Sequence, residues 1–73
     1  MWKWNIDILL KGSGNIVRCM YEGPEEDTRS VIVKLFQGKG PNEWVDLLGD
    51  DTKHHKFIVV SEIAYVDIYE RKR

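Results

Sequence analysis

Apolar and polar residues alternate over the first 11 residues of the chain. Positions 2, 4, 6, 8 and 10 are all apolar, and the odd positions between them include Lys3, Asn5 and Asp7. Successive side chains of a strand point to opposite faces, so this alternation predicts a strand with one buried face. That face holds two indoles and three aliphatic side chains, and we expect the rest of the chain to cover it.

A glycine-rich turn and a second extended run follow the first strand. Residues 11–15, Lys-Gly-Ser-Gly-Asn, have the composition of a turn, and residues 16–22 can pair back as the second strand of a hairpin. Both faces of that run are partly apolar, which predicts cover on one side and partial shielding on the other. Cys19 is expected to be a small core residue and not a nucleophile, because no neighbouring basic side chain would lower its pKa.

A helical pattern follows the second strand. A proline at position 24 and acidic residues at 25–27 suit the start of a helix. Apolar residues at 31, 32, 35 and 36 form one stripe, and Gly38 is placed to end the helix. We therefore predict a helix from Glu25 to Gln37, although the β-branched run at 31–33 opposes it mildly. This stripe is the only helical face available for the first strand, and we expect Trp4, Ile6 and Ile8 to lie under Ile32, Leu35 and Phe36.

Three further strands are predicted in the second half of the chain. Residues 43–48 form the first, residues 55–60 the second, and the alternating residues 64–70 the third. The unbroken apolar run at 57–60 predicts a central strand covered on both faces. The order strand-strand-helix-strand-strand-strand predicts one α+β domain over residues 1–73. It has an antiparallel sheet of about five strands with one helix packed on one face, or the same sheet curled into a small, partly open barrel.

The length of 73 residues limits the size of the core. A chain this short buries only about 60% of the surface that its unfolded form exposes, so its stability needs help. The single cysteine excludes an internal disulfide, and Cys19 with His54 and His55 lacks the spacing of a structural zinc site. A dense aromatic core or self-association remains, and we expect no metal or cofactor.

The charge balance gives no overall preference for a polyanion. The 11 basic and 12 acidic residues leave a formal net charge of −1, which removes the simplest argument for nucleic-acid binding. No apolar run approaches the roughly 20 residues that span a membrane, and no signal peptide is evident. A lone cysteine fits a reducing compartment, so we expect a cytoplasmic protein.

No grouping of residues suggests catalysis, and we expect a protein that is not an enzyme. The serines have no accompanying base motif, and the adjacent carboxylates look solvated, whereas a general acid needs burial to raise its pKa. His54 and His55 fall in a turn or at a strand start, where neighbours point to opposite faces. The sequence Gly38-Lys39-Gly40 is not a phosphate loop, because a helix precedes it and a strand follows it.

Exposed aromatic residues are the candidate contacts with a protein partner. Trp2 lies at the end of the first strand, where cover from one short helix runs out. Tyr65 and Tyr69 lie on the polar face of the last strand. An exposed last strand can pair with its symmetry mate, so we expect a homo-oligomer.

Nucleic acid is the alternative partner. Aromatic side chains interleaved with basic ones on a sheet face bind single strands. Acidic neighbours dilute the charge, and the acidic turns at 25–27 and 50–51 could instead imitate nucleic-acid charge. The candidate nucleic-acid contacts, beside the two tyrosines, are Lys3, Arg18, Arg71 and Arg73.

Four segments carry a resemblance to a known group of proteins: IDILLKGSG at 6–14, CMYEG at 19–23, VKLFQG at 33–38 and VSEIAYV at 60–66. Together they resemble small uncharacterised proteins encoded by phages and prophages of Gram-positive bacteria. The resemblance implies expression in the host cytoplasm during infection or lysogeny. It also implies an accessory, regulatory or host-defence-related binding role, and it carries no site residues.

The fold pattern resembles small barrels of the Sm-like or SH3-like kind. The likeness rests on the first hairpin, with its glycine turn, and on the late segment SEIAYV at 61–66. It implies a nucleic-acid or nucleotide-binding function as the alternative to protein binding. The Sm-like pattern places its helix before the first strand, whereas the helix predicted here follows the second.

Overall fold

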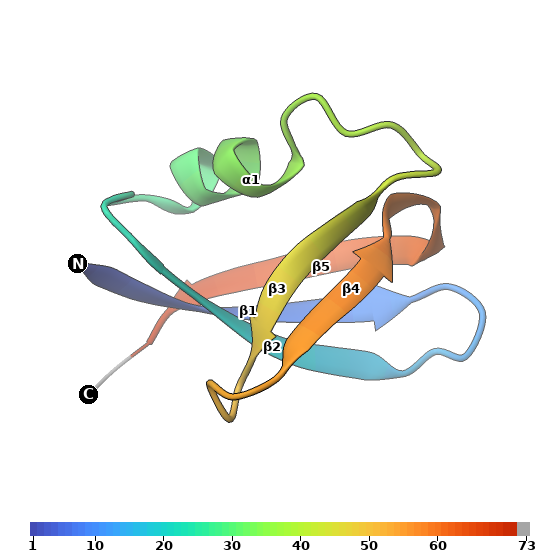
Figure 1. The fold of residues 1–73 in the computed structure, drawn as a ribbon, viewed down its shortest axis with the longest axis horizontal. Helices are drawn as coiled ribbons and strands as arrows, with labels where there is room; N and C mark the ends of the chain where they lie inside the picture. Colours follow the sequence, from blue (N-terminus) through green and yellow to red (C-terminus); the bar gives the residue numbers. More distant parts are fainter. Residues whose placement is uncertain (72–73) are drawn as a thin grey trace.

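Strand β1 (Trp2–Leu10) forms where the alternating pattern predicts it, in a computed structural model that describes residues 1–71. It lies between β2 (Ile16–Gly23) and β5 (Ile63–Glu70) and pairs with both in antiparallel fashion (Figure 1). The remaining elements are α1 (Thr28–Phe36), β3 (Trp44–Gly49), β4 (His55–Val59) and the 3₁₀ helix η1 (Val60–Glu62). The predicted α+β fold, an antiparallel five-stranded sheet with one helix, is confirmed.

Helix α1 is shorter at its N-terminus than the sequence predicts. Asp27 is its N-cap, in extended conformation, and its side chain accepts a hydrogen bond of 2.7 Å from the Ser30 N–H. This bond satisfies one of the amides that a helix start leaves free. It also holds the pKa of the Asp27 carboxyl below its usual range. The acidic residues at 25–27 therefore precede the helix instead of forming its first turn. Beyond the other end, Gly38 adopts a φ of 75°, the conformation that commonly follows a helix.

The spatial order of the strands, β4-β3-β2-β1-β5, requires a strongly curled sheet. The edge strands β4 and β5 are joined by only the three residues of η1. Five flat strands spaced about 4.8 Å apart would separate the two edges by about 19 Å, whereas three 3₁₀ residues span about 6 Å. The β3–β4 hairpin accordingly crosses over the layer formed by β1, β2 and β5 (Figure 1). No pairing joins β4 to β5 within residues 1–71, so the sheet is not closed.

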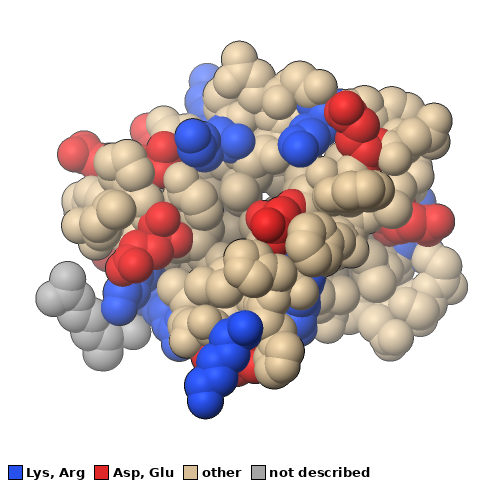
Figure 2. All heavy atoms as spheres, in the orientation of Figure 1, with Lys and Arg blue, Asp and Glu red and all other residues tan. Residues whose placement is uncertain are grey.

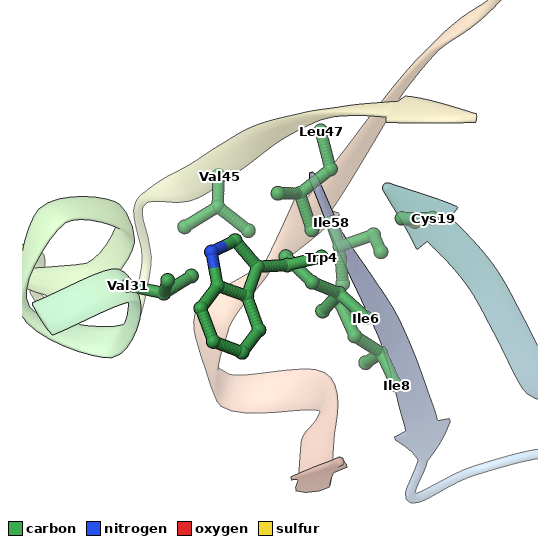
Figure 3. Packing of buried hydrophobic residues seen from close by; sticks show 8 residues of the cluster. All are labelled: Trp4, Ile6, Ile8, Cys19, Val31, Val45, Leu47 and Ile58. Atoms are coloured by element: carbon green, nitrogen blue, oxygen red, sulfur yellow. The ribbon is translucent and has the colours of Figure 1, made fainter. Parts of the chain in front are cut away.

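The core lies between the crossing hairpin and strand β1 (Figure 3). Trp4, Ile6 and Ile8 supply the floor, as the alternation predicts, and the hairpin supplies much of the cover. Full burial of one aliphatic side chain contributes about 1.5–3 kcal/mol, so this contact is a principal source of stability. The buried cluster consists of Trp4, Ile6, Ile8, Cys19, Val31, Val45, Leu47 and Ile58.

The expectation that the helix stripe covers β1 is wrong in its main part. Val31 is the buried residue of α1, while Ile32 is 37% exposed and Leu35 and Phe36 pack only at the margin of the core. A helix of nine residues is about 14 Å long and cannot cover the whole of β1. The hairpin takes its place, which a pattern of local periodicities does not reveal.

The expectation that residues 55–60 form a central strand covered on both faces is also wrong. β4 is an edge strand, and Ile58 is its buried residue. The apolar run combines one residue facing the core with others facing outward. Hydrophobicity alone does not distinguish a covered strand from one that carries an exposed apolar face.

Candidate functional site

The outer face of the β3–β4 hairpin carries the two most exposed aromatic side chains of the sheet. Trp44 is 59% exposed, Phe57 62% and Val59 37%. Trp44 and Val59 are directly opposite in the ladder, and Phe57 lies two pairs further along on the same face, opposite Asp46. We refer to Trp44, Phe57 and Val59 as the aromatic strip. Soluble proteins seldom leave such side chains clustered in the open, so the strip is a candidate interaction surface.

The strip follows from strict alternation on two paired strands. Val45 and Leu47 turn inward on β3, and Ile58 turns inward on β4. Their neighbours must therefore point outward. Asp46, two residues after Trp44, marks that outward face in the sequence. This is the signal that could have placed Trp44 on the surface, and sequence reasoning missed both Trp44 and Phe57 as candidate contacts.

The backbone of β4 is unpaired along its outer side. The Val60 N–H donates to the Glu43 carbonyl at 2.8 Å, and the Gly49 N–H donates to the His54 carbonyl at 2.6 Å. Hydrogen-bonded pairs alternate along an antiparallel ladder, so the even-numbered residues of β4 bond to β3. The N–H groups of His55, Phe57 and Val59, and the C=O groups of His55 and Phe57, consequently point away from β3. Val59 is the N-cap of η1, and its carbonyl serves that helix. The outward groups form what we call the open edge.

Two histidine–carboxylate contacts fix the tip and outer face of the hairpin. The Asp51 carboxylate accepts hydrogen bonds from the Lys53 N–H at 2.9 Å and from the His54 ring and N–H. These bonds, that of Lys53 first, lower the pKa of Asp51 to about 2. The His55 Nδ1 lies 2.9 Å from Asp46 Oδ1, and its ring stacks on Phe57 with centroids 6.4 Å apart. Both histidines are exposed, as expected, and each is oriented by a carboxylate.

A groove on the outer face of the β1-β2-β5 layer gathers several of the predicted residues. It has a volume of about 510 Å³. Arg18 of β2 comes together there with Tyr69 and Arg71 from the end of the chain's last strand. The lining residues are Asn5, Asp7, Arg18, Cys19, Asp50, Tyr69, Glu70 and Arg71.

Electrostatics make this groove a poor phosphate site. Two arginines face three carboxylates, those of Asp7, Asp50 and Glu70. The Tyr69 hydroxyl donates to Asp7 Oδ2 at 3.0 Å, which raises the pKa of the tyrosine and occupies its donor. Figure 2 shows basic and acidic side chains interspersed, with no continuous basic patch on the face that it displays.

The predicted partner contacts do not form one surface. Trp2 is 40% exposed at the start of β1, on the core side of the sheet, where cover runs out as expected. Tyr65 and Tyr69 lie on the opposite face, with their rings exposed. Lys3 is 4.0 Å from the Glu22 carboxylate and does not line the groove. Arg73 lies outside the described residues.

Cys19 is buried, as predicted for a core residue. Burial raises the pKa of its thiol, which disfavours the reactive thiolate. Within residues 1–71 no three His, Cys, Asp or Glu side chains are grouped so as to hold a metal ion. None of the described helices is long and apolar enough to cross a membrane. Comparisons with protein-family models, with curated proteins and with solved structures found no match for this chain.

Proposed function

We propose that this chain is a small non-enzymatic binding protein that acts through protein–protein contacts as an oligomer. The observation that carries the proposal is the aromatic strip beside the open edge of β4. Tryptophan and other aromatic residues are enriched at the centres of protein interfaces and contribute most of their binding energy. The strip places Trp44 and Phe57 on one face of one hairpin, more than half exposed.

The biological setting that we propose is that of a phage accessory or host-defence-related protein. This part of the proposal is supported by the resemblance of the segments at 6–14, 19–23, 33–38 and 60–66 to phage and prophage proteins.

Sedimentation velocity over a range of concentrations tests the oligomer. Between about 1 μM and 1 mM, which spans weak to moderate affinities, we expect the weight-average sedimentation coefficient to rise. The double variant Trp44→Ser/Phe57→Ser should suppress that rise, because it removes both aromatic rings of the strip and leaves the buried core residues unchanged. Tyr65→Ser, a substitution of a comparably exposed aromatic residue on β5, is the matched control. A sedimentation coefficient that stays at the monomer value throughout contradicts the proposal.

A nucleic-acid-binding small barrel is the second candidate function. The curled sheet, with both edges brought to η1, and the meeting of Arg18, Tyr69 and Arg71 in one groove favour it. The three carboxylates in the same groove oppose it. Titration with single-stranded DNA and RNA at two salt concentrations decides, because phosphate contacts must weaken as salt rises. Absence of binding at the lower salt removes this candidate, and binding that Arg18→Gln/Arg71→Gln abolishes supports it.

A further inference from the structure

We propose that two copies of this chain pair through their β4 strands, antiparallel, with Phe57 on the two-fold axis. The pairing rests on the proposed function, which calls for an oligomer, and adds the surface and register by which it forms. It would join the two five-stranded sheets edge to edge into one continuous sheet. The occupant of the open edge is a second copy because the edge is complementary to itself in one register.

Backbone hydrogen bonds select that register first. His55 and Phe57 direct both their N–H and C=O groups to the open edge, and Val59 directs its N–H there, as the bonds at Val60 and His54 establish. With Phe57 opposite Phe57, His55 of each copy lies opposite Val59 of the other. The two Phe57 residues then exchange both of their backbone bonds, and the Val59 N–H of each copy meets the His55 carbonyl of the other.

The neighbouring registers bring strand residues against amides that are already hydrogen-bonded. Moving the axis one residue toward the C-terminus pairs His55 with Ser61, whose N–H is already bonded to the Pro41 carbonyl at 2.9 Å. Moving it one residue the other way pairs Val59 with Lys53, whose N–H is bonded to the Asp51 carboxylate at 2.9 Å. Either shift leaves strand hydrogen bonds unmade at its ends.

Charge selects the same register. Axis placement at residue 56 would set Lys56 directly opposite Lys56 of the second copy, and like charges opposite each other destabilise a strand pair. The axis at Phe57 sets Lys56 opposite Ile58 instead. Strand β4, whose sequence is HKFIV, contains no carboxylate. No acidic side chain is therefore brought against its own copy.

The side chains are also arranged to meet. Residues directly opposite in a ladder place their side chains on the same face, so the exposed Phe57 rings become cross-strand neighbours. The aromatic strips of the two copies then merge into one outer face. Aromatic pairs of this kind add to the contribution of strand pairing itself.

Engineered disulfides test the register directly. We expect Phe57→Cys to form a covalent dimer with oxidised glutathione, because directly opposite hydrogen-bonded residues have Cα atoms about 5.5 Å apart, within the range that a disulfide spans. A mixture of His55→Cys and Val59→Cys should form the mixed dimer. Neither variant alone should, since each residue lies about 13 Å along the strand from its own copy. Tyr65→Cys on β5 is the control, and the native Cys19 thiol is buried.

A proline at the open edge tests the pairing without an introduced thiol. Val59 has a φ of −71°, which proline adopts without strain, and its N–H points away from β3. We therefore expect Val59→Pro to fold like the original chain and to weaken self-association about tenfold or more. Each copy loses the N–H that Val59 would donate to the His55 carbonyl of the other copy. Far-ultraviolet circular dichroism verifies the fold.

The outcomes separate the pairing from the broader proposal. Covalent dimers from Phe57→Cys and from the mixed pair, with none from Tyr65→Cys, support it. Self-association of undiminished strength in Val59→Pro overturns the β4 pairing. Disulfide dimers of Tyr65→Cys that form as readily as those of Phe57→Cys also overturn it. Either result leaves the proposal of an oligomer intact. A strict monomer at about 1 mM overturns both.

Discussion

The two edge strands of the sheet, β4 and β5, are joined by the short helix η1 but differ in their charged and aromatic side chains. β4 has no carboxylate and an exposed Phe57, whereas β5 carries Asp67 and Glu70 and follows directly on Glu62. Charged residues on an edge strand discourage pairing with other chains. The carboxylates therefore lie on β5, while the only charged side chain of β4 apart from His55 is Lys56, opposite the buried Leu47; the proposed pairing uses β4.

The direction of the backbone groups reinforces the difference. The Arg71 N–H donates to the Lys3 carbonyl at 2.9 Å, which fixes the phase of the β1–β5 ladder. From Tyr65 onward, beyond the register shift near Ile63, the odd-numbered residues of β5 therefore bond to β1 and the even-numbered ones point to the free side. Their side chains, among them Val66 and Ile68, lie on the core side of the sheet. At β4, by contrast, Phe57 combines backbone groups that point to the open edge with an exposed aromatic ring.

Removing the core contact beneath the hairpin has the largest expected effect on this comparison. Leu47 is fully buried from β3, and Leu47→Ala should lower the free energy of unfolding by about 2–5 kcal/mol. Urea denaturation measures it. Tyr65→Ala on the exposed face of β5 should change stability by less than about 0.5 kcal/mol. Equal losses in the two variants would show that the hairpin is not a principal cover of the core.

Introducing a charge at each edge gives the next largest effect. Phe57→Lys places two ammonium groups opposite each other in the proposed dimer and removes an aromatic pair. The dissociation constant should rise about tenfold, or about 1.4 kcal/mol, from the two terms together. Tyr65→Lys, the matched variant on β5, should leave it unchanged. Analytical ultracentrifugation of both proteins decides, and equal effects would erase the distinction between the edges.

The negative charge of β5 carries a smaller stability cost. Asp7 and Asp67 are directly opposite in the β1–β5 ladder, while Arg18 lies opposite Asp7 on the other side. Relieving the repulsion with Asp67→Asn should raise the free energy of unfolding by about 0.2–1 kcal/mol. Glu26→Gln, at an exposed position before the helix, serves as control. A loss of stability in Asp67→Asn would mean that the carboxylate has a favourable partner.

The smallest effect is a pH dependence at the tip of the hairpin that leads into β4. The pKa of Asp51 is about 2 in the folded chain and about 3.9 when unfolded. A lowered folded pKa contributes stability that is present above the unfolded value and is lost as the pH falls through the folded one. The stability difference between the original chain and Asp51→Asn should therefore shrink between about pH 4 and pH 2. Asp50→Asn, one residue away, is the control, and a difference that stays constant with pH contradicts the assignment.

The sequence predicts the local elements well and the long-range ones poorly. The alternation around Trp4, Ile6 and Ile8 is a property of neighbours, so β1 and its buried face could be read from the chain. Which segment covers that face depends on how the sheet curls, and no local period encodes it. The local pattern therefore predicts the helix stripe as the cover of β1, whereas the β3–β4 hairpin provides most of it.

The candidate surfaces follow the same division. Exposure of Trp2 and Tyr65 could be predicted, because each depends on a strand end or on alternation. The run at 57–60 could not be resolved, because four apolar residues look alike whether they are covered or form a binding surface. The groove needs Arg18 and Arg71 from distant parts of the chain, a meeting that only the strand order produces.

Hydrogen–deuterium exchange of single amides, followed by NMR as the concentration rises, is the most direct test of the β4 edge. The amide of Phe57 points to the open edge in the monomer and is hydrogen-bonded across the proposed two-fold axis. Its protection should therefore increase with concentration, together with that of Val59, while the outward amides of Val66 and Ile68 on β5 keep a constant exchange rate. Protection that grows at Val66 and Ile68 and not at Phe57, or that grows at neither edge, would contradict the account.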